Sequence, residues 1–281
     1  MPEGPEVTII AQGLNNLLSG CYTLGFEFNT KSRYNKKAPD GFNEFQQSVQ
    51  QTPTKVIKVA NKGKFIYWTF SNGYILFQTL GLSGGWFHTE KNNSGCQFFF
   101  KHLKTGDIQS LFYDDQRRFG TLKFINNQAE LDAKLATIGP DLLNDTDFDL
   151  ADWLTIFHTR RNQNKMIFKV ITDQKIVSGI GNYLKAEILY EAKISPHRLV
   201  HTLTDNELST LYTVAKKQIK QSFKSGGTSI KNYSDIDNKD GTYSYQLKVY
   251  GKKKDPHGNS VKGEKIGRDS QTTYWVPNIQ I

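Results

Sequence analysis

A change of hydrophobic period near residue 145 constrains the fold of this 281-residue chain more than any other feature. From Gly25 to about Ile125, short aromatic and β-branched runs alternate with turn sequences such as Asn72-Gly73 and Thr105-Gly106-Asp107, which is typical of strands joined by hairpins. After the acidic, turn-prone segment Asp145–Asp149, apolar residues recur at helical spacing. The sequence therefore predicts an α+β protein, with a two-layer β-sandwich followed by a helical part.

Individual elements follow from the same periodicities. An N-terminal helix is predicted from apolar residues at helical spacing that stop at Gly20, namely Val7, Ile10, Ala11, Leu14, Leu17 and Leu18. The expected strands are Lys55–Ala60, Phe65–Phe70, Tyr74–Leu80, Gln97–Leu103 and Ile108–Tyr113, with two later ones at Tyr243–Tyr250 and Thr272–Val276. The expected later helices are Leu150–Arg160, Met166–Thr172, Asn182–Ala192 and Thr204–Lys224, the last opened by a capping box of Thr204 and Glu207.

The charge of the chain is unevenly distributed. Residues 1–150 carry 15 basic and 15 acidic side chains, whereas residues 151–281 carry 21 and 12, so the whole net charge of +9 lies in the second part. A basic half of this kind favours a polyanionic partner such as nucleic acid.

The cysteine count and the hydropathy indicate the cellular compartment in which the protein is expected. Cys21 and Cys96 are too few for a disulfide framework and have no partner at metal-ligand spacing, so they are expected to be reduced. Neither a signal-like leader nor an apolar run approaching 18 residues is present. We therefore expect an intracellular protein that is neither secreted nor inserted in a membrane.

The opening sequence Met1-Pro2-Glu3-Gly4-Pro5-Glu6 indicates a reactive N-terminus. Removal of Met1 would leave Pro2 with a free secondary amine, and α-amino groups have a pKa of about 7.7–8.0. Such an amine forms an iminium ion with a carbonyl-like carbon. Glu3 is its neighbour, and the positive helix end near Glu6 would disfavour the protonated amine. The alternative is an ordinary helix start, in which Pro occupies the first turn.

Two glycine-flanked positions in the first half suggest contacts with DNA. Lys64 follows Gly63 at the start of a strand and could hold a phosphate, although a solvated turn lysine has the same pattern. Leu82 lies in Leu80-Gly81-Leu82-Ser83-Gly84-Gly85 and is either a buried loop residue or a wedge that fills the gap left by an extruded nucleotide.

A third polar loop, Asp115-Gln116-Arg117-Arg118-Phe119-Gly120, combines guanidinium groups with an aromatic ring. Arg117 could hydrogen-bond an orphaned base, and Phe119 could stack on the neighbouring base. The Arg-Arg-Phe sequence alone is a weak pattern, so its weight comes from its combination with the other motifs.

The second half contains a glycine-hinged turn that opens directly into a helix, from Ser178 to Glu187. Backbone N–H groups at such a helix start, with the Asn182 amide and Lys165, suit a phosphate group. A glycine-rich terminal hairpin carries Lys252-Lys253-Lys254 and Arg268, which would make DNA binding salt dependent unless it is only a solvated basic tail.

These motifs together resemble the Fpg/Nei family of DNA glycosylases along essentially the whole chain. The sequences Pro-Glu-Gly-Pro-Glu and Gly-Ile-Gly-Asn-Tyr-Leu-Lys-Ala-Glu are more similar to the Nei branch, endonuclease VIII and the Nei-like enzymes. The resemblance implies a β-sandwich catalytic domain over residues 1–147, a helix–two-turn–helix domain over 148–235 and a β-hairpin finger over 236–281, with DNA in the cleft between domains.

The resemblance also implies residue roles. Pro2 is the expected nucleophile at C1′, Glu3 the general acid, and Glu6 and Lys64 complete the catalytic group. Lys64, Lys165 and Asn182 resemble phosphate binders, and Tyr183 belongs to the same DNA-binding turn. Leu82, Arg117 and Phe119 resemble the residues that fill the void left by the extruded nucleotide.

The predicted finger departs from the zinc-binding pattern of the family. His257, Ser260, Val276 and Ile279 stand where zinc-containing members have cysteines, and Val and Ile cannot coordinate a metal. A zincless finger without metal or other cofactor is therefore expected, with Tyr274, Trp275 and Val276 packing in place of metal bonds. Gln271 aligns with the finger arginine of the family, and Arg268 is the candidate to replace it.

The implied activity is that of a bifunctional DNA glycosylase and AP lyase of base excision repair. It would remove oxidised bases, with pyrimidines favoured, through a Pro2 iminium and β,δ-elimination. The expected partner is damaged DNA, duplex or single-stranded, and the expected state is a monomer in nucleus or cytoplasm, depending on the source. The alternative is a non-catalytic binder of kinked, abasic or gapped DNA, which has no need of Pro2 beside Glu3.

Overall fold

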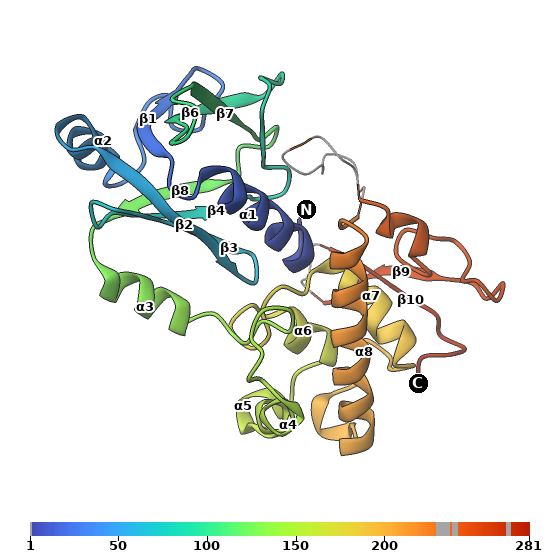
Figure 1. The fold of residues 1–281 in the computed structure, drawn as a ribbon. Coiled ribbons are helices and arrows are strands. Elements are labelled where there is room, and N and C mark those ends of the chain that lie inside the picture. Colours follow the sequence, from blue (N-terminus) through green and yellow to red (C-terminus); the bar gives the residue numbers. More distant parts are fainter. Residues whose placement is uncertain (1, 229–236, 238–240, 268–270) are drawn as a thin grey trace. The chain divides into compact units, whose positions relative to one another are not determined.

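The computed structural model describes residues 2–228, 237, 241–267 and 271–281. The chain divides into two compact units (Figure 1). The first unit contains Met1–Pro2, Glu6–Thr137 and Gly226–Thr242. The second contains Glu3–Pro5, Ile138–Ser225 and Tyr243–Ile281.

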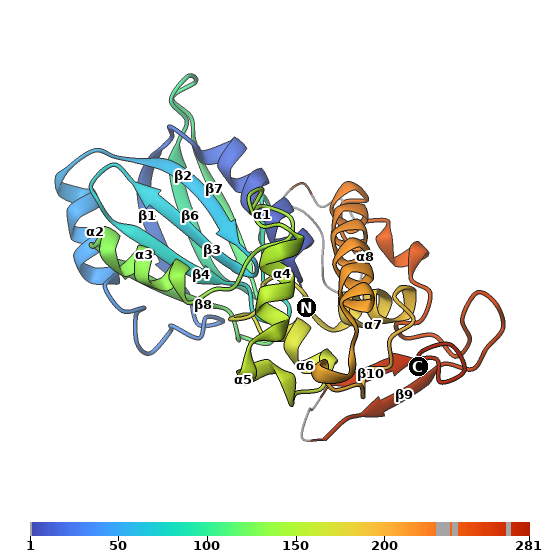
Figure 2. The same ribbon diagram turned by 90° about the horizontal axis from the view of Figure 1, so that it is seen from below.

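The first unit is built on an eight-stranded antiparallel sheet in the order β5-β7-β6-β1-β2-β3-β4-β8. Only two residue pairs join β1 to β2, so the sheet bends there into two four-stranded halves that form a β-sandwich (Figure 2). Its strands are β1 Tyr22–Phe28, β2 Thr54–Lys62, β3 Phe65–Phe70, β4 Ile75–Thr79, β5 Gly85–Phe87, β6 Ser94–Lys101, β7 Ile108–Asp114 and β8 Thr121–Ile125. Its helices are α1 Gly4–Leu18, α2 Phe42–Gln51 and α3 Gln128–Ala136.

The expected N-terminal helix and the five expected strands of this unit are confirmed, with both hairpin turns. Three strands, β1, β5 and β8, are not among the individually predicted ones. In β1 the register shifts beside Gly25, which breaks the alternation. The expectation of strands throughout this stretch is wrong at α2, a polar helix whose one buried residue is Phe45.

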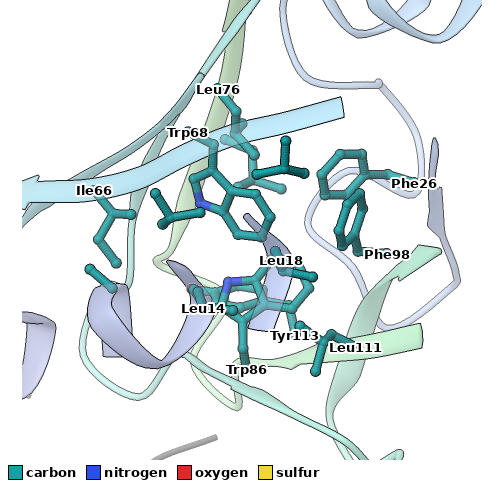
Figure 3. Close-up of a cluster of buried hydrophobic side chains, with 14 of the residues drawn as sticks. Leu14, Leu18, Phe26, Ile66, Trp68, Leu76, Trp86, Phe98, Leu111 and Tyr113 are labelled. Atoms are coloured by element: carbon teal, nitrogen blue, oxygen red, sulfur yellow. The ribbon is translucent and has the colours of Figure 1, made fainter. Parts of the chain in front are cut away.

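The core of the first unit lies between α1 and the sheet. Figure 3 shows Leu14 and Leu18 of α1 beside the rings of Trp68, Trp86 and Tyr113. The two tryptophan rings lie 5.6 Å apart, and both indole N–H groups donate to Oε1 of Gln78 at 3.2 Å. Gln78 is fully buried, so this single acceptor satisfies two polar groups inside the core.

The second unit is helical around α7 Asn182–Glu191, whose residues 183–190 are all buried. The surrounding helices are α4 Leu150–His158, α5 Arg160–Gln163, α6 Ile167–Thr172 and α8 Asp205–Lys224, with a 3₁₀ turn η1 at Val200–Thr202. The predicted helices and the Thr204–Glu207 capping box are confirmed. No helix among the described residues is both long and apolar enough to cross a bilayer.

The terminal segment of the second unit forms a hairpin of β9 Lys262–Lys265 and β10 Thr272–Trp275. The strand predicted at Tyr243–Tyr250 is wrong, because this stretch holds the 3₁₀ turn η2 Tyr243–Gln246 followed by a bend. The side chain of Glu187 in α7 accepts the backbone N–H groups of residues 248, 249 and 250. These bonds occupy the N–H groups of residues 248–250, so these three groups are not available to a sheet partner. Burial raises the pKa of Glu187, although the three N–H groups oppose the rise.

Two turns that flank the β9–β10 hairpin are held by side chains, one by a carboxylate and the other by an amide. Asp255 accepts from the backbone N–H of His257 and Asn259 and from the Tyr190 hydroxyl at 2.8–3.0 Å. Gln280 accepts from the backbone N–H of Val276 at 2.6 Å. Val276 itself is fully buried in an apolar cluster with Tyr190 and Val249, against which Tyr274 packs.

A zinc ion does not fit between these two turns. The Val276 side chain offers no ligand atom and is enclosed by apolar groups, and the carboxylate of Asp255 is engaged by N–H and O–H donors. Within the described part of the chain, no three His, Cys, Asp or Glu side chains converge as metal ligands do. Tyr274 and Val276 pack as the sequence predicted.

Trp275 has a different environment from its two neighbours. Its indole donates to Oε1 of Glu264, which also pairs with His197 at 2.7 Å, and Oε2 pairs with Lys262 at 2.7 Å. Partial burial raises the pKa of Glu264, but the hydrogen bonds from Lys262, His197 and Trp275 outweigh it and bring the pKa to about 2. This group ties β9 to β10 and to the loop that carries His197.

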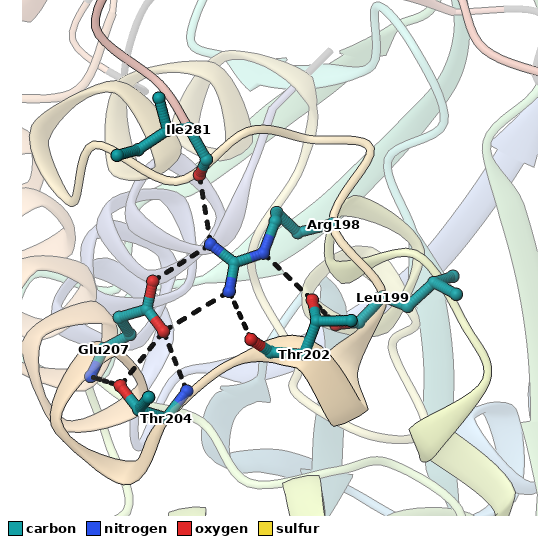
Figure 4. Close-up of polar contacts among 6 residues, drawn as sticks. All are labelled: Arg198, Leu199, Thr202, Thr204, Glu207 and Ile281. Carbon is teal, nitrogen blue, oxygen red and sulfur yellow. Dashed lines mark hydrogen bonds and ion pairs between the residues drawn. The ribbon is translucent and has the colours of Figure 1, made fainter.

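Arg198 joins three further parts of the second unit (Figure 4). Its guanidinium donates to Glu207 in the first turn of α8 and to the Ile281 carbonyl at 3.0 and 3.2 Å. It also bonds the hydroxyl and carbonyl of Thr202 in η1. One side chain therefore holds the start of α8, η1 and the final residue together.

We expect Gln78→Met to lower the free energy of unfolding by about 1–2 kcal/mol, because two indole N–H groups lose their acceptor. The buried Nε2 of Gln78 has no partner among the described residues, so its removal offsets part of the loss. Urea unfolding measures the effect. The matched control is Gln109→Met at an exposed position of β7, which should stay within about 0.5 kcal/mol of the parent. Equal effects would contradict the shared-acceptor role.

We expect Glu264 to stabilise the fold above pH 4.5 and to lose this contribution as pH falls towards 2, because its folded pKa lies below the usual 4.5. Its side chain is 23% exposed, so we discount the effect to about 1 kcal/mol. The loss caused by Glu264→Gln in urea should be more than halved between pH 6 and pH 3. Glu130→Gln, in an exposed pair with Lys123, is the control. A loss independent of pH would refute this assignment.

Candidate active site

The carboxylate of Glu3 lies at the start of α7 and accepts three backbone N–H groups. Oε2 accepts from Gly181 at 2.7 Å and from Leu184 at 3.3 Å, and Oε1 accepts from Tyr183 at 2.9 Å. The side chain is 2% exposed. N–H donors and a helix N-terminus both favour the negative form, so the resting group is a carboxylate in a fixed position.

Glycines make this close approach possible. The backbone N–H of Gly4 donates to the Gly179 carbonyl at 2.8 Å, and a Cβ on Gly4 would lie 2.9 Å from the Gly179 Cα. A Cβ on Gly181 would lie 2.4 Å from the Glu3 Cδ. Glycine is therefore required at positions 4 and 181, where the Glu3 segment meets the helix.

Pro2 and Glu6 are both buried, but the structure gives Glu6 a supporting position. Its Oε1 accepts from the backbone N–H of Thr228 at 2.8 Å and from the Thr228 hydroxyl at 3.1 Å. Thr228 in turn bridges to Thr242. Glu6 thus anchors a segment more than two hundred residues away, a contact for which the sequence offered no signal.

Lys64 lies at the turn between β2 and β3, after Gly63 with a φ of 55°. The turn is held by Asn61, whose Nδ2 donates to the Gly63 carbonyl at 3.1 Å and to the Thr8 hydroxyl of α1 at 2.9 Å. Lys64 is half-buried. Asn61 was not singled out from the sequence, because an asparagine in a turn is ordinary there.

Leu82, Arg117 and Phe119 come together on two adjoining loops of the first unit. Ser83, next to Leu82, donates to Asp115 at 2.7 Å and accepts from the Arg117 backbone at 3.1 Å. Leu82 is half-buried and Arg117 is exposed, and 58% of Phe119 is exposed. A large aromatic ring with that exposure is available to a partner.

Asn182 and Lys165 lie in the second unit, and the side-chain nitrogen of each donates a hydrogen bond. Asn182 Nδ2 donates to the Thr272 carbonyl of β10 at 3.0 Å, and its buried Oδ1 has no partner among the described residues. Lys165 Nζ donates to Oδ1 of Asn162 at 3.2 Å and is half-buried. The Tyr183 side chain is in the core, where its hydroxyl contacts Ser222 at 2.9 Å, so only its backbone N–H serves the site.

Two residues were predicted to act from the finger, and the structure describes only one of them. Gln271 is exposed and directly precedes β10. Arg268 lies outside the described residues.

We expect Gly181→Ala to destabilise the protein by about 1–3 kcal/mol, because the new methyl group overlaps the Glu3 carboxyl group in a packed site. The φ of Gly181 is −128°, so alanine adds no backbone strain. Thermal unfolding of Gly181→Ala in the Glu3→Ala background is the control, since the overlap is absent there. The same cost in both backgrounds would show that the overlap is not the cause.

Comparison with protein families gives matches in three successive parts of the chain. Residues 1–122 match the formamidopyrimidine-DNA glycosylase N-terminal domain, residues 138–234 match the H2TH domain of the same enzymes, and residues 234–281 match their C-terminal domain. The chain is also 31% identical over 257 residues to a formamidopyrimidine-DNA glycosylase of Legionella pneumophila (strain Lens), covering 91% of this chain and 89% of the relative. It is 28% identical to the Listeria innocua enzyme over 100% of both chains.

Solved structures show the same fold. The complex of Lactococcus lactis Fpg with an abasic-site DNA has a TM-score of 0.83 at 24% identity, and MutM with a carbocyclic 8-oxo-G DNA has 0.83 at 23%, each covering 99% of both chains. Matches in all three parts and 31% identity over 91% of the chain lead to one assignment: this chain belongs to the formamidopyrimidine-DNA glycosylase family.

Proposed function

We propose that this protein is a bifunctional DNA glycosylase and AP lyase of base excision repair. The observation that carries the proposal is the Glu3 carboxylate, which three N–H groups hold next in the chain to Pro2. A buried carboxylate fixed in this way is typical of a reacting centre rather than of a surface helix start. The relatives named as formamidopyrimidine-DNA glycosylases support the reaction class.

The proposed first step forms a bond between the Pro2 nitrogen and C1′ of the damaged nucleotide while the C1′–base bond breaks. Pro2 must lose its proton to act as a nucleophile, and the ionised Glu3 carboxylate is a suitable acceptor in the neighbouring residue. The protonated Glu3 then gives this proton to the ring oxygen O4′ as the C1′–O4′ bond breaks, and the electron pair of the Pro2 nitrogen forms the C1′=N bond of the iminium. The departing base takes the bonding electron pair and a proton from water.

The lyase steps follow from the iminium that this attack produces. The iminium makes the α-proton acidic, so β-elimination releases one phosphate and δ-elimination the other. Hydrolysis of the remaining iminium regenerates Pro2. The chemistry needs no metal ion or redox cofactor, because the iminium itself accepts the electron pair.

Contacts with DNA form the second part of the proposal. Leu82, Arg117 and Phe119 fill the space left by the flipped nucleotide, which offsets part of the cost of unstacking, about a few kcal/mol. Lys64, Lys165 and Asn182 bind phosphates, and Gln271 or Arg268 acts from the finger. Tyr183 contributes through the backbone N–H that holds Glu3, while Glu6 keeps the Thr228 segment in position.

The remaining assignments extend the same proposal. We propose domains at 1–147, 148–235 and 236–281. Within the wider Fpg/Nei family we propose a Nei-like chain with a zincless finger, because Val276 and Ile279 pack as apolar side chains where zinc-containing members have cysteines. The partner is damaged DNA, duplex or single-stranded, bound by a monomer inside the cell. Oxidised pyrimidines are the favoured lesions.

Borohydride trapping on abasic-site DNA tests the nucleophile. We expect a covalent adduct with the mature protein, with Met1 absent by mass spectrometry, and a much slower rate for Pro2→Gly at matched pH. Gly keeps a primary amine, so rates are compared as well as yields. An absent adduct, or an unchanged rate for Pro2→Gly, would favour the non-catalytic DNA binder.

Glu3→Gln separates the two activities. The amide would turn its NH₂ group towards an N–H donor of α7, so the variant loses both the proton carrier and part of its anchoring. We expect base excision to fall by about 100-fold or more, whereas cleavage of a preformed abasic site falls less. An equal fall in both would contradict the acid role at base removal.

A further inference from the structure

Two loops of the first unit are held together by hydrogen bonds and close backbone contacts that the sequence does not reveal. The first loop, residues 80–84, carries Leu82, and the second, residues 115–120, carries Arg117 and Phe119. The two are more than thirty residues apart in the chain. We call them together the wedge pair.

The side chain of Asp115 is the central link of the wedge pair. Its Oδ1 accepts from the Ser83 hydroxyl at 2.7 Å and from the Arg117 backbone N–H at 3.3 Å, and its Oδ2 accepts from the Gly120 N–H at 2.7 Å. Both Asp115 and Ser83 are 6% exposed. The carboxylate therefore fixes both ends of its own loop and reaches across to the other.

Backbone contact reinforces this link. Gly81 has a φ of 65°, and a Cβ there would lie 2.6 Å from the Gly120 nitrogen and 2.7 Å from the Phe119 carbonyl carbon. A Cβ on Gly84 would lie 2.0 Å from the Tyr113 hydroxyl, which donates to the Leu80 carbonyl at 3.2 Å. The loops touch main chain to main chain, so neither can move far without the other.

Arg33 adds an outer restraint. Its Nη1 donates to the carbonyls of Gly120 at 3.1 Å and Phe119 at 3.5 Å. Between the restrained residues, Arg118 adopts a φ of 56°, an uncommon conformation for a residue with a side chain. The loop keeps this shape because its neighbours on both sides are tied down.

We propose that Asp115 and Ser83 are positioning residues that preassemble Leu82, Arg117 and Phe119 into a rigid wedge for duplex DNA. The inference rests on the proposed function and deepens it. Inserting three side chains into a stack is more favourable when their loops are already ordered, because the ordering entropy is lost on folding and not on binding. Single-stranded DNA has no opposite base to replace, so it does not need the wedge.

The test compares Ser83→Ala and Asp115→Asn with the parent on two substrates. We expect kcat for excision of a paired lesion to fall about tenfold or more, since small misplacements of positioning groups are costly. Borohydride trapping on single-stranded abasic DNA should stay within about threefold. Ser83→Thr retains the hydroxyl and should restore most of the activity on duplex DNA.

Asp114→Asn is the matched control for charge and for a merely structural role. Asp114 is the neighbouring carboxylate, and it accepts from the Asn93 backbone at 2.8 Å, away from the wedge pair. Asp114→Asn removes the same charge as Asp115→Asn, so a change in DNA affinity that is caused by charge alone appears in both variants. A duplex-specific loss in Asp114→Asn equal to that in Asp115→Asn would overturn the proposal.

A second readout needs no catalysis and so separates this inference from the proposed function. 2-Aminopurine placed opposite a non-cleavable abasic analogue changes its fluorescence when the wedge enters the stack. We expect slower or incomplete insertion in Ser83→Ala and Asp115→Asn at equal folded fraction, checked by thermal unfolding. Parent-like insertion in both variants, or equal losses on duplex and single-stranded DNA, would refute the positioning role. An inactive parent that still inserts would refute the proposed function alone.

Discussion

The bonds between the Glu3 carboxylate and the first N–H groups of α7 are the interaction on which the proposed chemistry depends. They fix Glu3, the residue that follows Pro2 in the chain, at the start of a helix whose residues 183–190 are all buried. N–H donors favour the ionised form of a carboxyl group, which suits the proposed role of Glu3 as a proton acceptor. Gly4 and Gly181 are needed at this contact, because a Cβ on either would lie less than 3.0 Å from Gly179 or Glu3, and Gly179 itself adopts a φ of 90°.

In each of the two units, one buried carboxylate also holds a loop in place. In the first, one carboxylate, Asp115, satisfies a serine hydroxyl and two N–H groups and thereby joins the loop after β4 to the loop after β7. In the second, Glu187 accepts three consecutive backbone N–H groups of the segment before the β9–β10 hairpin. Buried carboxylates are costly unless they are fully hydrogen-bonded. Each of these is therefore strong evidence that the loop it holds has a defined conformation.

In the proposed zincless finger, hydrogen bonds and apolar packing hold the β9–β10 hairpin. In the zinc-binding pattern, four metal bonds join the two turns. Here, Asp255 and Gln280 close the two turns, Val276 fills the space between them and α7, and Glu264 gathers three donors across the strands. Hydrogen bonds to ionised groups and burial are individually weaker than metal coordination, but they are distributed over several residues.

The sequence by itself determined the α+β class, most elements and the family resemblance, because hydrophobic period, capping boxes and short motifs are local properties. It failed at β1, at α2 and at Tyr243–Tyr250, where a bulge, a polar helix and a distant carboxylate override local preference. Only the tertiary structure decided that Glu3 meets Gly181 and that Ser83 meets Asp115. Those contacts join residues 178 and 32 positions apart, and separations of that size leave no periodic trace in the chain.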